Sequence, residues 1–262
     1  MLENLGHESC ALGFMAGFTG DEIAKRLRER GVNSDFIHVE EGLSRINVKL
    51  RSNEESEING QGPAIKQKDI EALYEKLACL EAGDTLVLAG SIPEVMPDDI
   101  YMDIMKRLQN KNVMIVVDAT KDLLVNVLPY HPFLIKPNNH ELGEIFGVEL
   151  QDTDEIIKYA KKLQEMGARN VLVSMAGDGA LLLTEEGQSF HSLPPDGQVV
   201  NSVGAGDSMV AGFIAGYIET HSYEDAFYMG LCCGSASAFS EELATRDEVM
   251  GLMKQINYGF HA

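Results

Sequence analysis

The sequence predicts an α/β fold in which helices cover both faces of a mostly parallel sheet. Short apolar runs alternate with amphipathic segments along most of the 262 residues, a pattern typical of strands joined by right-handed helical crossovers. The hydrophobic fraction is 45% and the charged fraction 24%, as in ordinary globular proteins. One stretch, at about residues 35–60, has strand-like runs with no helix between them. We therefore expect one three-layer domain over residues 1–262, with a small antiparallel β lid inserted at about 35–60.

The first elements lead into this insertion. Ser9–Ala16 predicts a strand, and Asp21–Arg30 predicts a helix that Gly31 closes at its C′ position. The insertion contains three strand-like runs, Phe36–Val39, Ser44–Leu50 and Glu57–Asn59. The middle run alternates apolar and polar residues, which predicts one buried face and one wet, cationic face. It is either a lid over a ligand or a solvated hairpin whose edge is protected by Lys and Arg.

After the insertion, helices and strands alternate again. Lys66–Leu80 predicts a helix because its leucines and Ile70 recur on one stripe. The following elements are strand Thr85–Ala89, helix Asp98–Gln109, strand Val113–Val117, a strand end at Leu134–Ile135, helix Asn138–Phe146, helix Asp154–Met166 and strand Asn170–Ser174. Near the C-terminus, Gly212 and Gly216 face small residues at 234–238, which predicts two closely packed helices.

Charge and cysteine content exclude several classes of protein. Lys and Arg total 21 against 41 Asp and Glu, for a net charge of −20. Such an acidic surface repels phosphate backbones and anionic lipids, so we expect neither a nucleic-acid nor a membrane partner. The four cysteines form no C-x-x-C pair, and we expect them to be reduced and buried; they are Cys10, Cys79, Cys232 and Cys233. With no long apolar run and no signal peptide, the sequence predicts a cytoplasmic protein.

The sharpest chemical motif is N-S-V-G-A-G-D at Asn201–Asp207, directly before an apolar helical segment. A glycine turn that opens a helix leaves backbone N–H groups unpaired at the positive end of the helix dipole, where a phosphate binds well. Asp207 would stand beside that phosphate and could take a proton from an acceptor hydroxyl. The alternative is that Asp207 merely caps the helix and the glycines form a tight turn.

A second motif is K-P-N-N-H-E at Lys136–Glu141. Asn138 and Glu141 are three residues apart on one helix face, so they could hold the waters of a Mg²⁺ ion while Lys136 meets a phosphate. Asn138 and Glu141 also fit a capping box at the start of the helix, and the two interpretations are compatible.

Two further turns could contact ligands. Ser174–Ala180 is rich in glycine and joins two apolar strands, so it is either a hairpin turn or a nucleotide-contacting loop. Ala89–Pro93 ends a strand, at the sheet edge where ligands bind in such folds. The Walker A pattern and the dinucleotide fingerprint G-x-G-x-x-G are both absent.

Taken together, these motifs resemble the ribokinase-like (PfkB) family of sugar kinases. Residues 201–214 match the C-terminal signature of that family, and Asn138-x-x-Glu141 lies where the family has its magnesium-associated motif. The resemblance implies a ribokinase-like fold, with ATP and Mg²⁺ as cofactors and Asp207 as the catalytic base. The other implied ATP- and anion-binding residues are Lys136, Ser174, Gly177, Asp178, Gly179, Gly204, Ala205 and Gly206. Asn138 and Glu141 are the implied magnesium residues, and Arg45, Asn47, Lys49 and Ser91 the implied sugar-phosphate residues.

The resemblance is strongest to members that phosphorylate fructose 1-phosphate at its 6-hydroxyl, chiefly through Leu43–Leu50 and residues 55–63. Two alternatives stay open: a tagatose-6-phosphate kinase, and a truncated product that binds nucleotide without sugar kinase activity. Compared with the family, the chain starts inside the first helix at Met1–Gly6, so we expect a βαβ-sized piece of roughly thirty to fifty residues to be missing. Family analogy also suggests a homodimer formed through the lid.

Overall fold

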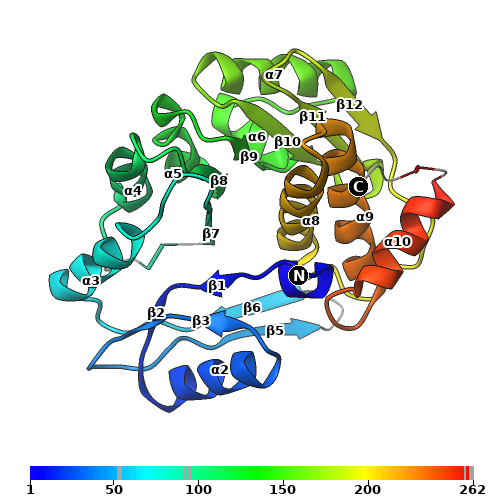
Figure 1. The fold of residues 1–262 in the computed structure, drawn as a ribbon. Coiled ribbons are helices and arrows are strands. Elements are labelled where there is room, and N and C mark those ends of the chain that lie inside the picture. The colour runs from blue at the N-terminus through cyan, green and yellow to red at the C-terminus, as the bar shows by residue number, and fades with distance from the viewer. Residues whose placement is uncertain (52–54, 91, 94–95, 257, 260–262) are drawn as a thin grey trace. The chain divides into compact units, whose positions relative to one another are not determined.

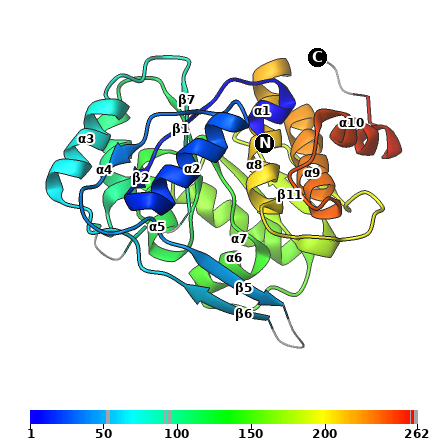
Figure 2. The same cartoon turned by 90° about the horizontal axis from the view of Figure 1, so that it is seen from below.

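The fold was obtained as a computed structural model, which describes residues 1–51, 55–90, 92–93, 96–256 and 258–259 (Figures 1 and 2). Two compact units are present. The first contains residues 1–7, 82–91 and 101–262, and the second contains residues 8–81 and 92–100.

The first unit is built on a six-stranded sheet. Its strands are β7 (Thr85–Ala89), β8 (Met114–Asp118), β9 (Leu134–Ile135), β10 (Asn170–Ser174), β11 (Ala180–Leu183) and β12 (Ser189–Ser192), in the spatial order β12-β11-β10-β9-β8-β7. Strands β7 to β10 are parallel, whereas β11 and β12 continue the sheet antiparallel. The prediction of a mostly parallel sheet is confirmed. The carboxyl ends of β7 to β10 meet at one edge, where Ala89 pairs with Asp118.

Helices lie on both faces of this sheet. The helices of this unit are α1 (Leu2–Leu5), α4 (Ile100–Leu108), α5 (Lys121–Val125), α6 (Asn139–Phe146), α7 (Thr153–Glu165), α8 (Ala205–Thr220), α9 (Tyr223–Phe239) and α10 (Arg246–Gln255), with short 3₁₀ turns at Leu128–Tyr130 and Ala176–Asp178. Among them, α1 packs on α8 and α10 packs on α9. Around β10 and β11, α8 and α9 cover one face and α7 packs on the other (Figure 1).

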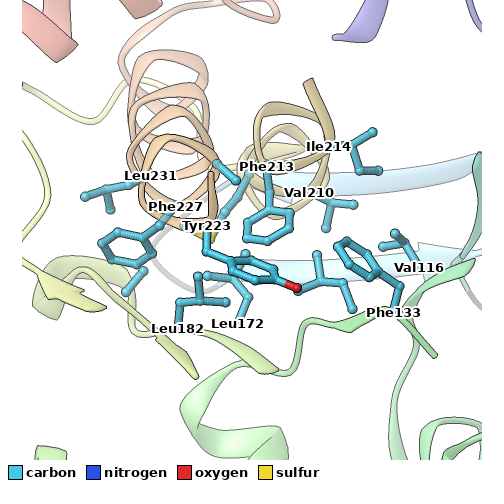
Figure 3. Packing of buried hydrophobic residues seen from close by; sticks show 14 residues of the cluster. Val116, Phe133, Leu172, Leu182, Val210, Phe213, Ile214, Tyr223, Phe227 and Leu231 are labelled. Carbon is cyan, nitrogen blue, oxygen red and sulfur yellow. The ribbon is translucent and has the colours of Figure 1, made fainter. Parts of the chain in front are cut away.

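The core beneath α8 and α9 is aromatic and aliphatic (Figure 3). Phe213 and Phe227 point from the two helices onto the sheet and are fully buried. They meet Leu172 and Leu182 from neighbouring strands. Burying each of these large side chains stabilises the fold by about 2–3 kcal/mol, so α8 is held firmly against the sheet.

Helices α8 and α9 approach each other closely along small residues, as the sequence predicts. A Cβ atom added to Gly212 would lie 2.6 Å from the Cys233 Sγ and 2.7 Å from the Met229 carbonyl oxygen. No larger residue fits there without displacing one of the helices.

Replacing Gly212 with Ala should therefore lower the free energy of unfolding by about 1–3 kcal/mol, because overpacking outweighs the better helix propensity of alanine. Gly251→Ala is the matched control, since Gly251 also lies within a helix, α10, but has nothing within 4 Å of an added Cβ. That change should raise the stability by up to about 1 kcal/mol. Urea unfolding of both variants measures the difference, and equal stabilisation by both would contradict the packing argument.

The second unit contains short strands and two helices: β1 (Cys10–Ala11), β2 (Phe14–Met15), α2 (Gly17–Glu29), β3 (Asn33–Ser34), β4 (Ile37–His38), β5 (Asn47–Arg51), β6 (Glu55–Asn59) and α3 (Gln67–Leu77). The predicted strand Ser9–Ala16 is wrong as a single element, because β1 pairs with β3 and β2 with β4 as separate parallel bridges. Helix α2 starts at Gly17, four residues before the predicted position, and Gly31 adopts the predicted left-handed conformation, with φ 76°.

The predicted three-run insertion is corrected in two ways. The first run belongs to the parallel β2–β4 pair, so only β5 and β6 form the antiparallel hairpin. The expected buried face is also wrong: Ile46 and Ile58 are each 61% exposed and Val48 is 42% exposed. A two-stranded hairpin has no second layer of its own to cover these side chains.

Two further expectations concern cysteines and membrane spans. Cys232 and Cys233 are buried, but Cys10 and Cys79 are exposed, so the prediction of four buried cysteines is wrong for two of them. Both exposed cysteines lie in the second unit, Cys10 on the two-residue strand β1 and Cys79 just after the end of α3. In the ranges described, no helix combines the length and apolar character that crossing a bilayer requires.

Candidate active site

The turn before α8 exposes backbone donors. Gly204 is the N-cap and has a left-handed φ of 81°, a conformation that glycine adopts without strain. Within the described part of the chain, the N–H groups of Gly204, Gly206 and Asp207 have no hydrogen-bond partner, whereas the N–H of Ala205 donates to the Ser202 carbonyl at 3.2 Å. Unpaired donors at the positive end of a sixteen-residue helix form a site suited to an anion.

The loop ahead of this turn is held by Asn201. Its side-chain oxygen accepts from the Val203 N–H at 3.2 Å, and its backbone N–H donates to the Ala238 carbonyl at 3.0 Å. The first bond stabilises the turn itself and the second connects it to the end of α9. Together they restrain the position of the unpaired donors.

Asp207 lies in the first turn of α8 and is exposed. The structure does not support the capping alternative, because the N-cap is Gly204 and Asp207 lies inside the helix, in its first turn. Across the residues described, the Asp207 carboxylate accepts no hydrogen bond and is open to a ligand.

Lys136 approaches the same turn from the sheet. It follows β9, is only 6% exposed, and places its Nζ 3.2 Å from the Asp118 Oδ1. A Cβ added to Gly206 would lie 3.4 Å from that Nζ. The lysine ammonium therefore sits beside the helix terminus, as the motif analysis expects of a phosphate-binding lysine.

Asp118 is a site residue that the sequence analysis missed. Burial raises the pKa of its carboxyl, the Lys136 ammonium opposes this rise, and the charges of Asp207 and Glu141 add to it. The carboxylates of Asp118, Asp207 and Glu141 therefore interact electrostatically near a single lysine. Because the negative charges outnumber the positive one, the group favours an additional cation. The available signal was an Asp directly after the buried run Val116–Val117, at the carboxyl end of a strand.

Asn138 and Glu141 form the capping box that the sequence allowed. The Asn138 Oδ1 accepts from the Glu141 N–H, and the Glu141 Oε2 accepts from the Asn138 N–H, both at 2.8 Å. Among the residues that the structure describes, the second carboxylate oxygen of Glu141 has no hydrogen-bond partner. Within the ranges described, no three His, Cys, Asp or Glu side chains converge into a direct metal site.

A pocket of about 770 Å³ opens next to this cluster. The Ser174–Gly179 turn, which the structure shows to connect antiparallel β10 and β11, lines one side. The pocket also contains Asn138, Ala205 and Gly206. Its other walls come from distant segments that the sequence analysis did not identify: Pro194, Pro195, Val199, Met209, Leu231 and Phe239. The volume and mostly apolar walls suit a small organic ligand with an anionic group.

Three of the four expected sugar-phosphate residues belong to the second unit. Asn47 and Lys49 lie on β5, and Arg45 is exposed two residues before it, all in the second unit. Ser91 lies outside the described residues. The first unit thus brings together the predicted catalytic, anion and metal residues, and the second carries the predicted substrate residues of the hairpin.

Comparisons with known proteins identify relatives over nearly the whole chain. The sequence profile described as pfkB family carbohydrate kinase matches residues 1–248. The 1-phosphofructokinase of Bacillus subtilis is 48% identical over 248 residues, or 95% of this chain and 81% of that protein. The D-tagatose-1-phosphate kinase of Bacillus licheniformis is 36% identical over 93% of this chain and 80% of its own length. The tetrameric inhibited form of Escherichia coli phosphofructokinase-2 superposes with a TM-score of 0.89 at 26% identity, covering 98% of this chain and 84% of that one.

Proposed function

Because the chain belongs to the pfkB family of carbohydrate kinases, we propose that it transfers the γ-phosphoryl group of ATP to the 6-hydroxyl of fructose 1-phosphate, giving fructose 1,6-bisphosphate and ADP. The observation that carries this proposal is the exposed Asp207 carboxylate beside the N–H groups of Gly204 and Gly206, which have no partner among the described residues. The identity of 48% with a 1-phosphofructokinase supports the choice of sugar phosphate. The reaction would take place in the cytoplasm, where ATP is available.

In the proposed reaction, the 6-oxygen of the sugar forms a bond to the γ-phosphorus while the bond from that phosphorus to the β,γ-bridging oxygen breaks. Asp207 takes the proton of the attacking hydroxyl, so the acceptor becomes a better nucleophile as the new bond forms. The free N–H groups of the α8 terminus and the Lys136 ammonium stabilise the negative charge of the transferring group.

The carboxylates at the site also suit Mg²⁺, which prefers hard oxygen donors. Asn138 and Glu141 would hold the ion through water, because the capping box already engages the Asn138 Oδ1 and one Glu141 oxygen. Asp118 adds a third oxygen donor beside Lys136. When bound, Mg²⁺ would neutralise charge on the ATP phosphates.

The pocket beside Ser174 is the proposed nucleotide site. We assign Ser174, Gly177, Asp178 and Gly179 to contacts with ATP, with Ala205 completing the anion-binding turn. Their common position around one pocket next to the α8 terminus supports this assignment. The apolar walls would receive the base, while the phosphates point to the helix terminus.

We assign the sugar phosphate to Arg45, Asn47, Lys49 and Ser91. Arg45→Ala should raise the KM for fructose 1-phosphate about 10-fold or more, since a charge-assisted contact is lost, and leave the KM for ATP unchanged. The matched control is Arg28→Ala on α2, which removes the same charge outside the proposed site. Steady-state kinetics with each substrate varied in turn decides the assignment; a selective rise in the KM for ATP would refute it.

We also propose that residues 1–262 form one kinase domain with the β5–β6 hairpin as its lid, and that a second copy covers the hairpin in a homodimer. The exposed apolar side chains Ile46, Val48 and Ile58 support such a contact. The related phosphofructokinase-2 of E. coli has a tetrameric form, which agrees with self-association in this family.

The experiment that tests the function compares kcat/KM for fructose 1-phosphate, fructose 6-phosphate, tagatose 6-phosphate and tagatose 1-phosphate with ATP and Mg²⁺. Fructose 1-phosphate should be preferred. A preference for tagatose 6-phosphate would favour the tagatose-6-phosphate kinase alternative, and a preference for tagatose 1-phosphate would favour the activity named for the relative from B. licheniformis. Nucleotide binding without turnover of any sugar phosphate would identify a product without kinase activity.

A further inference from the structure

Tyr101 makes a contact at the active-site edge of the sheet that the proposed mechanism does not use. It lies in the first turn of α4, and its hydroxyl donates to the Ala89 carbonyl at 2.9 Å, with the Gly90 carbonyl 3.4 Å away. Both carbonyls belong to the carboxyl end of β7, where Gly90 turns the chain with a left-handed φ of 87°.

This strand end has a definite place relative to the nucleotide pocket. Along the parallel strands from β10 to β7, the edge carries Ser174, then Lys136, then Asp118 and finally Ala89. The pocket contains Ser174 at one end of this row, and the phosphate-handling cluster around Lys136 lies in the middle. An acceptor that receives a phosphoryl group from that pocket must approach the cluster from the other side, which is the side of β7.

The chemistry of Tyr101 suits a fixed structural donor. Burial, together with the Asp118 charge, raises its pKa to about 12, so the phenol keeps its proton at any physiological pH. The single O–H of the phenol therefore holds the Ala89 carbonyl at the end of β7, with the Gly90 carbonyl beside it. In the sequence, Gly90 is followed by Ser91, one of the proposed sugar-phosphate residues.

We propose that Tyr101 is a positioning residue for the acceptor substrate: its hydroxyl fixes the Ala89–Gly90 turn so that the edge beside Asp118 is preformed for the sugar phosphate. This inference rests on the proposed kinase function. Tyr101 acts through the backbone, with no contact to the reacting atoms.

Tyr101→Phe tests the proposal because it removes only the hydroxyl. Its matched control is Tyr223→Phe, whose hydroxyl donates to the Glu185 carboxylate at 2.8 Å beside the amino end of β10. We expect Tyr101→Phe to raise the KM for fructose 1-phosphate about 3- to 10-fold, the size of one lost hydrogen bond, with the KM for ATP unchanged. Tyr223→Phe should change the melting temperature at least as much and neither KM.

Calorimetric titration of fructose 1-phosphate into protein saturated with a non-hydrolysable ATP analogue measures the same property without turnover. Weaker sugar-phosphate binding by Tyr101→Phe, with unchanged binding by Tyr223→Phe, supports the inference. Equal binding by the wild type and Tyr101→Phe, or the same loss in both variants, overturns the inference and leaves the kinase proposal intact. If the wild type neither binds nor phosphorylates fructose 1-phosphate, the proposed function fails, and the inference fails with it.

Discussion

Asp207→Asn should lower kcat on the order of 10²- to 10⁴-fold and leave the KM for ATP nearly unchanged, because the amide keeps the shape of the side chain but cannot accept the hydroxyl proton. The melting temperature should stay equal or rise slightly, since the substitution removes a charge that raises the pKa of Asp118. Loss of activity with retained stability would separate a chemical role from a structural one.

Asp247→Asn is the matched control for that experiment. Asp247 is also an exposed carboxylate in the first turn of a helix, but it belongs to α10 and lies outside the proposed site. Its replacement should leave kcat within about twofold, as expected for a surface change. An unchanged kcat in Asp207→Asn, or an equal loss in both variants, would refute the assignment of the catalytic base.

Lys136→Met should lower kcat on the order of 10²-fold or more and also destabilise the protein by about 3 kcal/mol. The first effect comes from losing a cation next to the transferring phosphoryl group. The second comes from leaving the Asp118 carboxylate without the ammonium that lies 3.2 Å away, in a place where its side chain is only 18% exposed. Lys121→Met is the control, because Lys121 is 74% exposed and lies 3.9 Å from Glu144. It should change neither property measurably.

The two effects of Lys136→Met can be separated. Adding Asp118→Asn removes the unpaired carboxylate, so the double variant should regain much of the stability but not the activity. The destabilisation of the single variant should also depend on pH. Burial raises the pKa of Asp118, so its ionised form costs stability once the pH exceeds the pKa in the unfolded chain, and this cost disappears as the pH falls and the carboxyl is protonated. Urea unfolding between acid and neutral pH measures this, and a loss independent of pH would contradict the ion-pair explanation.

Much of the first unit could be predicted from the sequence because its central strands, β8 to β11, are continuous apolar runs that are almost wholly buried. Strands β7 and β10 have the predicted bounds, since each is a short apolar run with a clear turn after it. The second unit was harder to predict. Its strands of two residues depend on long-range pairing, as between β2 and β4, and local pattern carries little information about such contacts.

The candidate site divides in the same way. The glycine turn at 204–206 and the Asn138–Glu141 capping box are local motifs, and both have the geometry that their sequences predict. Asp118 was missed because its place at the end of β8 depends on the register of the parallel strands. Tyr101 was missed because its hydroxyl reaches the Ala89 carbonyl only through the packing of α4 against the end of β7. The pocket wall that includes Phe239 likewise depends on how α9 packs, which no single stretch of sequence encodes.

The close contact between α8 and α9 at Gly212 and Cys233 limits how α8 can move. A helix packed so closely against its neighbour cannot slide or tilt when a nucleotide binds. The N–H donors at its N-terminus are therefore already oriented in the free protein. Phosphate capture should then require little rearrangement of α8, and any motion that shuts out water during turnover must be carried by other parts of the protein. Weakening this helix contact would make the orientation of the N-terminal donors less well defined, although every chemical group of the site would still be present.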